Sequence, residues 1–159
     1  YKNPVETKKY FYEDQNHCIW GCTGDIGYVD EDGYLFVEGR ANDSFYSEDG
    51  KRIYLFDIER IVLEDEMVAQ CKAVAVQING KFKPILHVVL QKNGVTDAKT
   101  VIPRIYKKLS EQLPQNAVPV AYKLRQTLPV HPNGKRNVEA LKAENDGFVD
   151  LMGNGWRVR

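Results

Sequence analysis

The sequence lacks several features that would each point to a class of protein. Neither charge is in excess, because 22 Lys and Arg residues balance 22 Asp and Glu residues. This balance argues against general binding to nucleic acid or an anionic membrane, but it is compatible with a local anion site. No apolar run reaches the length of a membrane-spanning helix. With 159 residues, 43% of them hydrophobic, the chain can build one compact domain, or a small domain and a segment of another.

Cysteine is scarce as well. Cys18, Cys22 and Cys71 are an odd number without framework spacing, which indicates free thiols in a reducing compartment. His17 adjoins Cys18, but no second Cys or His pair completes a zinc set, so we expect no metal site. The charged N-terminal segment lacks the apolar centre of a signal peptide. Together these features predict a cytoplasmic protein.

Turn-forming residues divide the chain into predicted elements. Residues 25–40 form a predicted hairpin around the turn 30–33. Residues 41–51 are polar and turn-rich, which indicates a linker or a short solvent-facing hairpin, with a domain boundary near Arg40 to Asp43. Beyond it the pattern predicts a helix at about 56–66, strands at 73–78 and 85–90 joined by an Asn79-Gly80 turn, a helix at 97–113, a strand at 121–125 and a short helix at 138–143.

This order of elements predicts an α+β fold with a mostly antiparallel sheet and flanking helices. Two prolines constrain it further. Pro84 should lie at the start of its strand or on a sheet edge, because it has no N–H to donate to a neighbouring strand. Pro103 fits if its helix begins near Thr100, because the amides of the first turn have no partner within the helix.

The loop 128–137 is the first candidate for chemistry. Its two prolines and Gly134 allow tight turns, and Lys135 presents a compact ammonium on a mobile tether. Such a charge suits a phosphoryl or acyl-phosphate oxygen that gains negative charge in a transition state. The loop lacks the first Gly and the following Ser or Thr of a Walker A loop. A solvated surface turn is the alternative, and it is the more common origin of a Gly-Lys pair.

The two ends of the hairpin 25–40 are the second candidate. Asp25 follows Thr23-Gly24, and its carboxylate could accept both hydroxyls of a ribose. Arg40 follows Gly39 and offers a fork of donors to ribose or phosphate oxygens. A hairpin brings its ends together, so the pair could handle a nucleotide. It could equally be a surface salt bridge beside a capped turn.

Five short motifs follow one another in an order that resembles the C-terminal end of the adenylate-forming enzymes, the superfamily of acyl-CoA synthetases and carrier-protein adenylation domains. The resemblance runs from about Asn3 to Leu141. The motifs are Asn3-Pro4 with Thr7, Trp20 with Thr23-Gly24-Asp25, the segment Ile26–Arg40, Gly50-Lys51-Arg52-Ile53 before Asp57-Ile58-Glu59, and Leu128-Pro129 with Pro132-Asn133-Gly134-Lys135.

The resemblance implies a two-step reaction and a division of the chain. A carboxylate attacks the α-phosphate of ATP with Mg²⁺, and the acyl-adenylate then passes its acyl group to the thiol of CoA or phosphopantetheine. Residues 1–41 would be the end of the large N-terminal domain, with its hairpin. Residues 42–150 would be a small mobile C-terminal domain, and 151–159 a tail.

The resemblance also implies roles for single residues. Lys135 would bridge the carboxylate and phosphate oxygens during adenylation, Asp25 would hold the ribose hydroxyls, and Arg40 would contact ribose or phosphate. Asn42 and Asp43 would form the hinge for a domain rotation between the two steps. After this rotation, Arg52 would meet the AMP phosphate, and Gly50 and Lys51 would line the thiol tunnel.

The chain departs from the family pattern around these residues. The hinge residue is commonly Asp or Lys and is Asn42 here. The segment between Arg40 and Gly50 is one residue longer than usual, and Asp49 replaces the customary small residue before the glycine. After Lys135 the chain reads Arg-Asn, where a β-branched residue and Arg are frequent.

Several functions stay open from the sequence. The acyl acceptor could be CoA, which the short tail favours, or a carrier protein. A non-catalytic nucleotide-binding relative and an unrelated α+β interaction domain are further alternatives. The phosphate-binding loop, adenine pocket and acyl pocket of the family are absent from these residues, so we expect the chain alone not to catalyse adenylation. The identity of the acid is not encoded in them.

Overall fold

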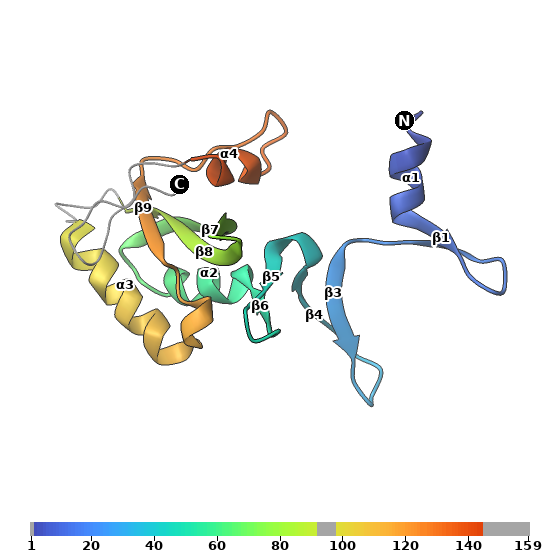
Figure 1. Cartoon of the computed structure of the whole chain (residues 1–159), viewed down its shortest axis with the longest axis horizontal. Coiled ribbons are helices and arrows are strands. Elements are labelled where there is room, and N and C mark those ends of the chain that lie inside the picture. The colour runs from blue at the N-terminus through green and yellow to red at the C-terminus, as the bar shows by residue number, and fades with distance from the viewer. Residues whose placement is uncertain (1, 92–97, 145–159) are drawn as a thin grey trace. The chain divides into compact units, whose positions relative to one another are not determined.

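The computed structural model describes residues 2–91 and 98–144. The chain divides into two compact units between Asn42 and Asp43. Figure 1 labels the elements of both units. The expected tail at 151–159 lies outside the described residues.

The first unit contains one helix and two hairpins. The helix α1 spans Pro4–Tyr10, and the first hairpin pairs β1 (Phe11–Glu13) with β2 (Ile19–Gly21). The second hairpin pairs β3 (Asp25–Val29) with β4 (Leu35–Arg40), as predicted. The helix and the first hairpin were not predicted, because residues 1–22 show no regular apolar period.

Two glycines shape the second hairpin. A Cβ atom at Gly27 would lie 2.2 Å from the carbonyl oxygen of Phe36, so only glycine fits where the register shifts next to Ile26. Gly33 closes the turn at a φ of +86°. The carboxylate of Asp30 accepts the backbone N–H groups of Asp32 and Tyr34 and holds the turn in place.

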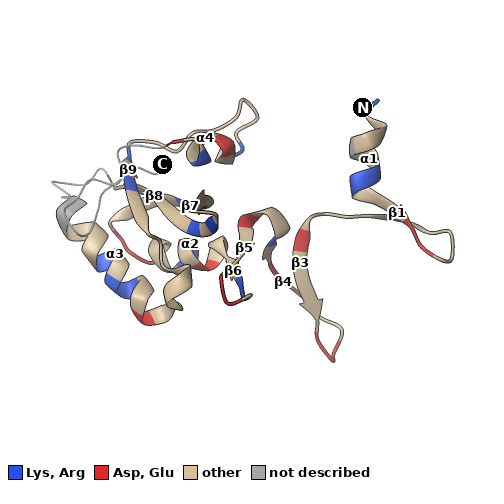
Figure 2. Cartoon of the chain, in the orientation of Figure 1, with Lys and Arg blue, Asp and Glu red and all other residues tan. Residues whose placement is uncertain are grey.

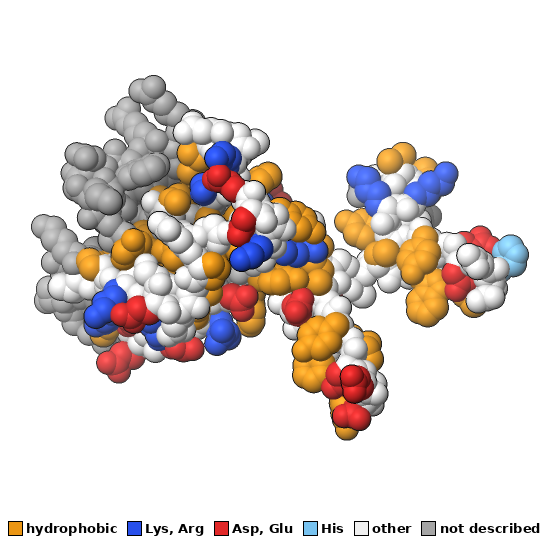
Figure 3. Space-filling view, turned by 60° about the horizontal axis from the view of Figure 1, so that its bottom comes forward, with side chains coloured by type: hydrophobic (Ala, Val, Ile, Leu, Met, Phe, Trp, Pro, Cys, Tyr) orange, Lys and Arg blue, Asp and Glu red, His pale blue; other side chains and the backbone are white. Residues whose placement is uncertain are grey.

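The part of the first unit that the structure describes has no hydrophobic core of its own. None of the side chains described between residues 2 and 42 is buried. Tyr28 and Phe36 stack at 5.2 Å between ring centroids, yet both remain about half exposed. Figure 3 shows hydrophobic side chains along this hairpin down to its acidic tip. Because an isolated hairpin is marginally stable in water, these apolar surfaces are typical of a segment that packs against further protein.

The second unit is built on a three-stranded sheet in the order β7-β8-β9. Strand β7 (Val68–Ile78) pairs antiparallel with β8 (Lys81–Leu90) through the predicted turn at Asn79-Gly80. Strand β9 (Ala121–Arg125) pairs parallel with β8, and the helix α3 (Ala98–Gln112) provides the crossover between them. The α+β fold with a mostly antiparallel sheet is thereby confirmed, with β9 as the parallel addition.

Helices cover both faces of this sheet (Figure 1). The helices α2 (Leu55–Leu63) and α3 pack on one face, and α4 (Val138–Lys142) lies on the other. The predicted apolar side of α2 is confirmed, since its inward residues are buried. The core on the α2 and α3 side includes Leu55, Ile58, Ile61, Val62, Ala73, Leu86, Val88, Ile102, Ile105, Leu109 and Tyr122.

The segment after the unit boundary is a hairpin and not a linker. After the short 3-10 helix η1 (Ala41–Asp43), strand β5 (Ser44–Tyr46) pairs with β6 (Arg52–Tyr54). The expectation that this hairpin faces solvent was wrong for one side, because Phe45 and Ile53 are buried in the core. The polar residues between the strands hid this alternation in the sequence.

Both proline expectations need correction. Pro84 lies inside the central strand β8, opposite Ala75. Its carbonyl accepts the N–H of Val120, which lies just before β9. Because the nitrogen and the carbonyl of a strand residue face the same side, the Pro84 nitrogen also faces β9, at the point where the parallel pairing begins. The missing N–H of Pro84 therefore removes no hydrogen bond between β7 and β8. Helix α3 begins at Ala98, which places Pro103 beyond the first turn. The 3-10 helix η2 (Gln115–Ala117) follows α3.

Ion pairs connect α3 to the residues that directly follow α2. Arg104 donates two hydrogen bonds to the carboxylate of Asp65, at 2.7 and 2.8 Å, and Lys108 lies 2.8 Å from Glu64. Figure 2 shows residues of both charges distributed along the helices and strands. No helix in the described part of the chain is long and apolar enough to cross a membrane.

The packing of the core predicts the effect of truncating a buried side chain on α2. Ile58→Ala should lower the free energy of unfolding by about 3 kcal/mol, because Ile58 is fully buried and the surrounding side chains only partly refill the space. Phe56→Ala is the matched control on the same helix, since Phe56 is 54% exposed and should change stability by less than about 1 kcal/mol. Urea unfolding measures both. Equal losses would contradict the packing described.

Candidate functional site

Asp25 and Arg40 meet at the open end of the second hairpin, as their positions in the sequence indicated. They are register partners, and Arg40 Nε lies 3.0 Å from Asp25 Oδ1. The entrance is held by backbone contacts: Asp25 N–H donates to Thr23 Oγ1, and Ala41 N–H donates to the carbonyl of Gly24. Both charged side chains stay exposed. Asp25 and Arg40 therefore form an exposed ion pair, and the carboxylate oxygens and guanidinium nitrogens are accessible to a ligand.

Arg52 lies on the outer face of the β5–β6 hairpin between two aromatic rings. Its guanidinium carbon is 5.4 Å from the ring centroid of Tyr46 and 5.9 Å from that of Tyr54. Its Nε donates to Ser44 Oγ at 3.0 Å. These contacts fix the stem and plane of Arg52, and its other nitrogens can meet an anion.

Gly50 and Lys51 belong to the tight turn between β5 and β6. Gly50 adopts a φ of +76°, its N–H donates to the carbonyl of Ser47, and Ser47 N–H donates to the carbonyl of Lys51. The Lys51 ammonium lies 3.6 Å from Asp49 and is largely exposed. Ser47 is buried beneath the turn, so the tip is held from inside the unit.

Asp43 is anchored to the second unit by a lysine that the sequence analysis did not single out. Lys72 on β7 places its ammonium 3.1 Å from Asp43 and 3.0 Å from Glu59 on α2. Glu59 also accepts the N–H of Ala73. Because β7 is an edge strand, this N–H has no neighbouring strand on its side, and Glu59 serves as its acceptor. Asn42, one residue earlier, is exposed. Asp43, the first residue of the second unit, is thus held by an ion pair to β7.

Burial sets the proton affinities in this cluster. Desolvation raises the pKa of Glu59, and Lys72 only partly offsets it. Desolvation alone would lower the pKa of Lys72, but Glu59 and Asp43 outweigh it and raise this pKa above its usual value. Lys72 therefore stays charged. The sequence drew attention to Glu59, within an Asp-Ile-Glu motif, and to Asp43, but not to Lys72 between them.

Lys135 lies in a small closed turn that follows β9. His131 N–H donates to the carbonyl of Lys135, and Gly134 N–H donates to the carbonyl of His131, with Gly134 at a φ of +79°. Asn133 Oδ1 accepts the N–H of Lys135 at 3.1 Å, and Val130 and Arg136 form a bridge below. The backbone is thus held, while the side chain is exposed and, in the described residues, has no carboxylate within ion-pair distance.

The candidate residues therefore fall into two groups. Asp25 and Arg40 belong to the first unit, and Arg52, Gly50, Lys51 and Lys135 belong to the second. Among residues 2–91 and 98–144, no group of three His, Cys, Asp or Glu side chains could hold a metal ion. In the second unit, Arg52, Lys51 and Lys135 offer cations to an anionic ligand, and in the first unit Asp25 offers an acceptor beside the donor Arg40.

Comparison with known proteins shows what the chain is similar to. The chain is 30% identical over 125 residues to 4-hydroxybutyrate–CoA ligase 1 of Metallosphaera sedula, covering 78% of this chain and 22% of that protein. The O-succinylbenzoate coenzyme A synthetase of Bacillus subtilis, solved in complex with AMP, matches 86% of this chain and 26% of its own with a TM-score of 0.68 and 27% identity. The chain corresponds to the C-terminal region of adenylate-forming ligases.

A further relative has a different acceptor in its name. The D-alanine–D-alanyl carrier protein ligase of Listeria welshimeri is 28% identical over 142 residues, which is 89% of this chain and 27% of that protein. No family model matches the chain. The chain spans about a quarter of the length of these adenylate-forming relatives.

The cluster around Lys72 generates a prediction about pH. Lys72→Met should lower the free energy of unfolding at neutral pH by about 3 kcal/mol, because it leaves the carboxylate of Glu59 in a desolvated position without its cation. The loss should shrink as the pH falls and Glu59 takes up a proton. The reason is that a carboxyl whose folded pKa is raised contributes most stability below its unfolded pKa, and this contribution disappears as the pH rises through the folded pKa.

Denaturant unfolding at several pH values measures this effect. Lys107→Met is the control, because Lys107 is exposed and lies 3.9 Å from Glu111 in an ordinary surface pair. A loss at Lys72 that is the same at every pH would show that Glu59 does not respond to its partner.

Proposed function

We propose that the chain is the C-terminal part of an ATP-dependent acid–thiol ligase, which forms an acyl-adenylate and then transfers the acyl group to CoA. The observation that carries the proposal is the loop of Lys135: a held backbone with an exposed ammonium, in a chain that is similar to CoA ligases over most of its length. The acid itself is recognised outside these residues.

In the first step a carboxylate oxygen of the acid attacks the α-phosphorus of ATP, the bond to the bridging oxygen breaks, and pyrophosphate leaves. The ammonium of Lys135 meets the carboxylate and phosphate oxygens as negative charge shifts between them. Because Asn133 and His131 already hold the loop backbone, only the side chain has to be ordered. This would be the main contribution of the second unit to adenylation.

Asp25 and Arg40 are proposed to bind the nucleotide. The carboxylate of Asp25 can accept the two ribose hydroxyls, and Arg40 can turn from Asp25 to a ribose or phosphate oxygen. Mg²⁺ would accompany the phosphates of ATP. We propose that the N-terminal domain supplies the protein ligands of this ion.

We propose that residues 1–41 are the end of a large N-terminal domain and that residues 42–150 form a mobile C-terminal domain. The absence of any buried side chain among those described in residues 2–42 supports this, since the hairpin then finds its core on the rest of that domain. Asn42 would absorb the change of φ and ψ, and Asp43, tied to Lys72, would move with the second unit.

In the second step the thiol attacks the acyl carbonyl carbon of the adenylate and AMP leaves. Gly50 and Lys51 are proposed to line the path of the thiol, and Arg52 to meet the phosphate of AMP with the nitrogens that Ser44 does not engage. We also propose a cytoplasmic location, which the free cysteines Cys18, Cys22 and Cys71 support.

A carrier protein is the second candidate acceptor. The similarity to a ligase that charges D-alanyl carrier protein favours it, because phosphopantetheine presents the same thiol arm as CoA. The full-length enzyme, loaded with its acid and ATP, should acylate CoA and leave phosphopantetheinylated carrier protein unmodified if the first candidate is right. Mass spectrometry of the acylated product distinguishes the two.

The adenylation role of Lys135 gives the central prediction. In the full-length enzyme, with a panel of carboxylic acids, Lys135→Ala should lower ATP–pyrophosphate exchange by about a hundredfold or more, because it removes a charge contact made in the transition state. Lys142→Ala is the matched control, an exposed lysine on the nearby helix α4, and should exchange like wild type.

Three outcomes separate the possibilities. A selective loss in Lys135→Ala supports the ligase, and the preferred acid identifies the substrate. Normal exchange in Lys135→Ala would make Lys135 a solvated turn residue. A wild-type enzyme that binds ATP but exchanges with no acid would favour a non-catalytic relative.

A further inference from the structure

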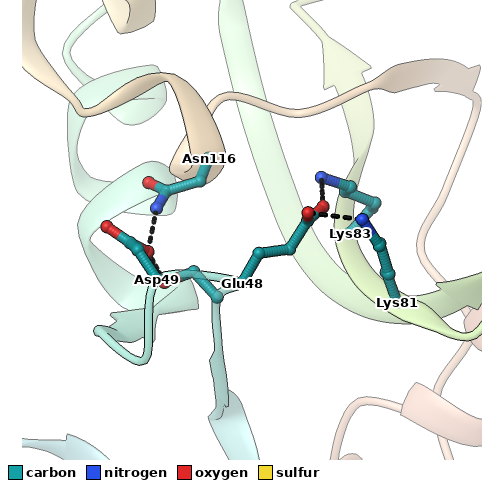
Figure 4. Close-up of polar contacts among 6 residues, drawn as sticks. Glu48, Asp49, Lys81, Lys83 and Asn116 are labelled. Atoms are coloured by element: carbon teal, nitrogen blue, oxygen red, sulfur yellow. Dashed lines mark hydrogen bonds and ion pairs between the residues drawn. The ribbon is translucent and has the colours of Figure 1, made fainter.

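Two acidic residues tie the β5–β6 turn to distant parts of the second unit. The turn comprises residues 47–51 and contains Glu48 and Asp49 directly before Gly50. Figure 4 shows that both acidic side chains point away from the turn tip towards other elements.

Glu48 joins the turn to the start of the central strand. One of its oxygens lies 2.5 Å from the ammonium of Lys81 and the other 2.9 Å from that of Lys83 (Figure 4). The hydrogen bonds from Lys81 and Lys83 lower the pKa of Glu48, so it is ionised at neutral pH. A single exposed ion pair is weak, but one carboxylate that engages two lysines on β8 restricts the turn in two directions.

Asp49 joins the same turn to η2, which follows α3. Asn116 Nδ2 donates to Asp49 Oδ1 at 2.8 Å, across 67 positions of sequence, and Ser47 Oγ lies 2.5 Å from the same oxygen. The contact with Ser47 is the main cause that lowers the pKa of Asp49. Asn116 is not exposed, so the contact seats the turn on the body of the unit.

We propose that Glu48 and Asp49 are positioning residues for the acyl-transfer step, and that they act by holding the 47–51 turn against Lys81, Lys83 and Asn116. The inference rests on the proposed function, in which this turn lines the path of the thiol. A turn that is held before the thiol arrives loses less conformational entropy on binding it. All five residues belong to the second unit, so the contacts move with it as one body.

The test separates the two half-reactions in the full-length enzyme. Asn116→Asp places a second carboxylate against Asp49 and should lower kcat/KM for CoA by about fivefold to tenfold, mostly through KM, because it replaces one hydrogen bond with a repulsion. ATP–pyrophosphate exchange should stay at the wild-type rate. This exchange also reports that the second unit is folded, because Lys135 belongs to it.

The reciprocal pair tests the contact itself. In the double variant Asp49→Asn/Asn116→Asp the amide and the carboxylate change places, so the hydrogen bond can form again and kcat/KM for CoA should recover to within about twofold of wild type. Failure to recover would overturn the assigned contact.

Glu48 has a matched control. Glu48→Gln should raise KM for CoA by about twofold to threefold, and Glu64→Gln should leave it unchanged. Glu64 is the fair comparison because its side chain is also 49% exposed and lies 2.8 Å from a lysine, Lys108, but it does not touch the turn.

The failures can be told apart. Normal acyl transfer in Asn116→Asp with normal exchange would overturn the inference and leave the ligase proposal intact. Equal losses in exchange and transfer would also overturn it, because the residues would then be merely structural. A wild-type enzyme without exchange for any acid would overturn the proposed function, and the inference with it.

Discussion

The burial of α2 against the sheet is the interaction on which the second unit depends. Ile58, Ile61 and Val62 are removed from water on the face that β7 and β8 provide. Because α2 begins directly after β6, its position also fixes the β5–β6 hairpin, with Arg52 and the 47–51 turn at its far end. Next to this apolar stripe, the helix presents Glu59 to Lys72 on β7. One apolar stripe therefore orients the anchor of Asp43 and the candidate anion contact together.

The two units differ in how completely they bury their own apolar side chains. The second unit encloses a core on each face of its sheet. The first unit leaves rings such as Tyr28, Phe36 and Trp20 exposed on two short hairpins. The domain rotation proposed above gives this difference a reason. The rigid body that moves must be stable alone, whereas a hairpin that belongs to a larger domain can draw its stability from that domain.

Much of the fold could be predicted from the sequence. The period of Ile58, Ile61 and Val62 indicated α2, and the Asn79-Gly80 pair indicated the β7–β8 hairpin, because these are local signals. The burial of Phe45 and the interior place of Pro84 could not be predicted, since both depend on partners far along the chain. The same holds for the site. The meeting of Asp25 and Arg40 follows from one hairpin, but Lys72 with Asp43 and Asn116 with Asp49 are contacts that only the folded sheet brings about.

The parallel pairing of β9 has a consequence for how the chain folds. The hairpin of β7 and β8 closes over a two-residue turn, whereas β9 can join β8 only after the whole α3 crossover has been placed. Long loops cost entropy before their contacts repay it, so β9 should be among the last strands to dock. The loop of Lys135 follows β9 and depends on it for its location. A chain that has collapsed around α2 and β7–β8 alone would be compact and yet would not have the loop of Lys135 in place, so the role proposed for Lys135 requires the fully folded unit.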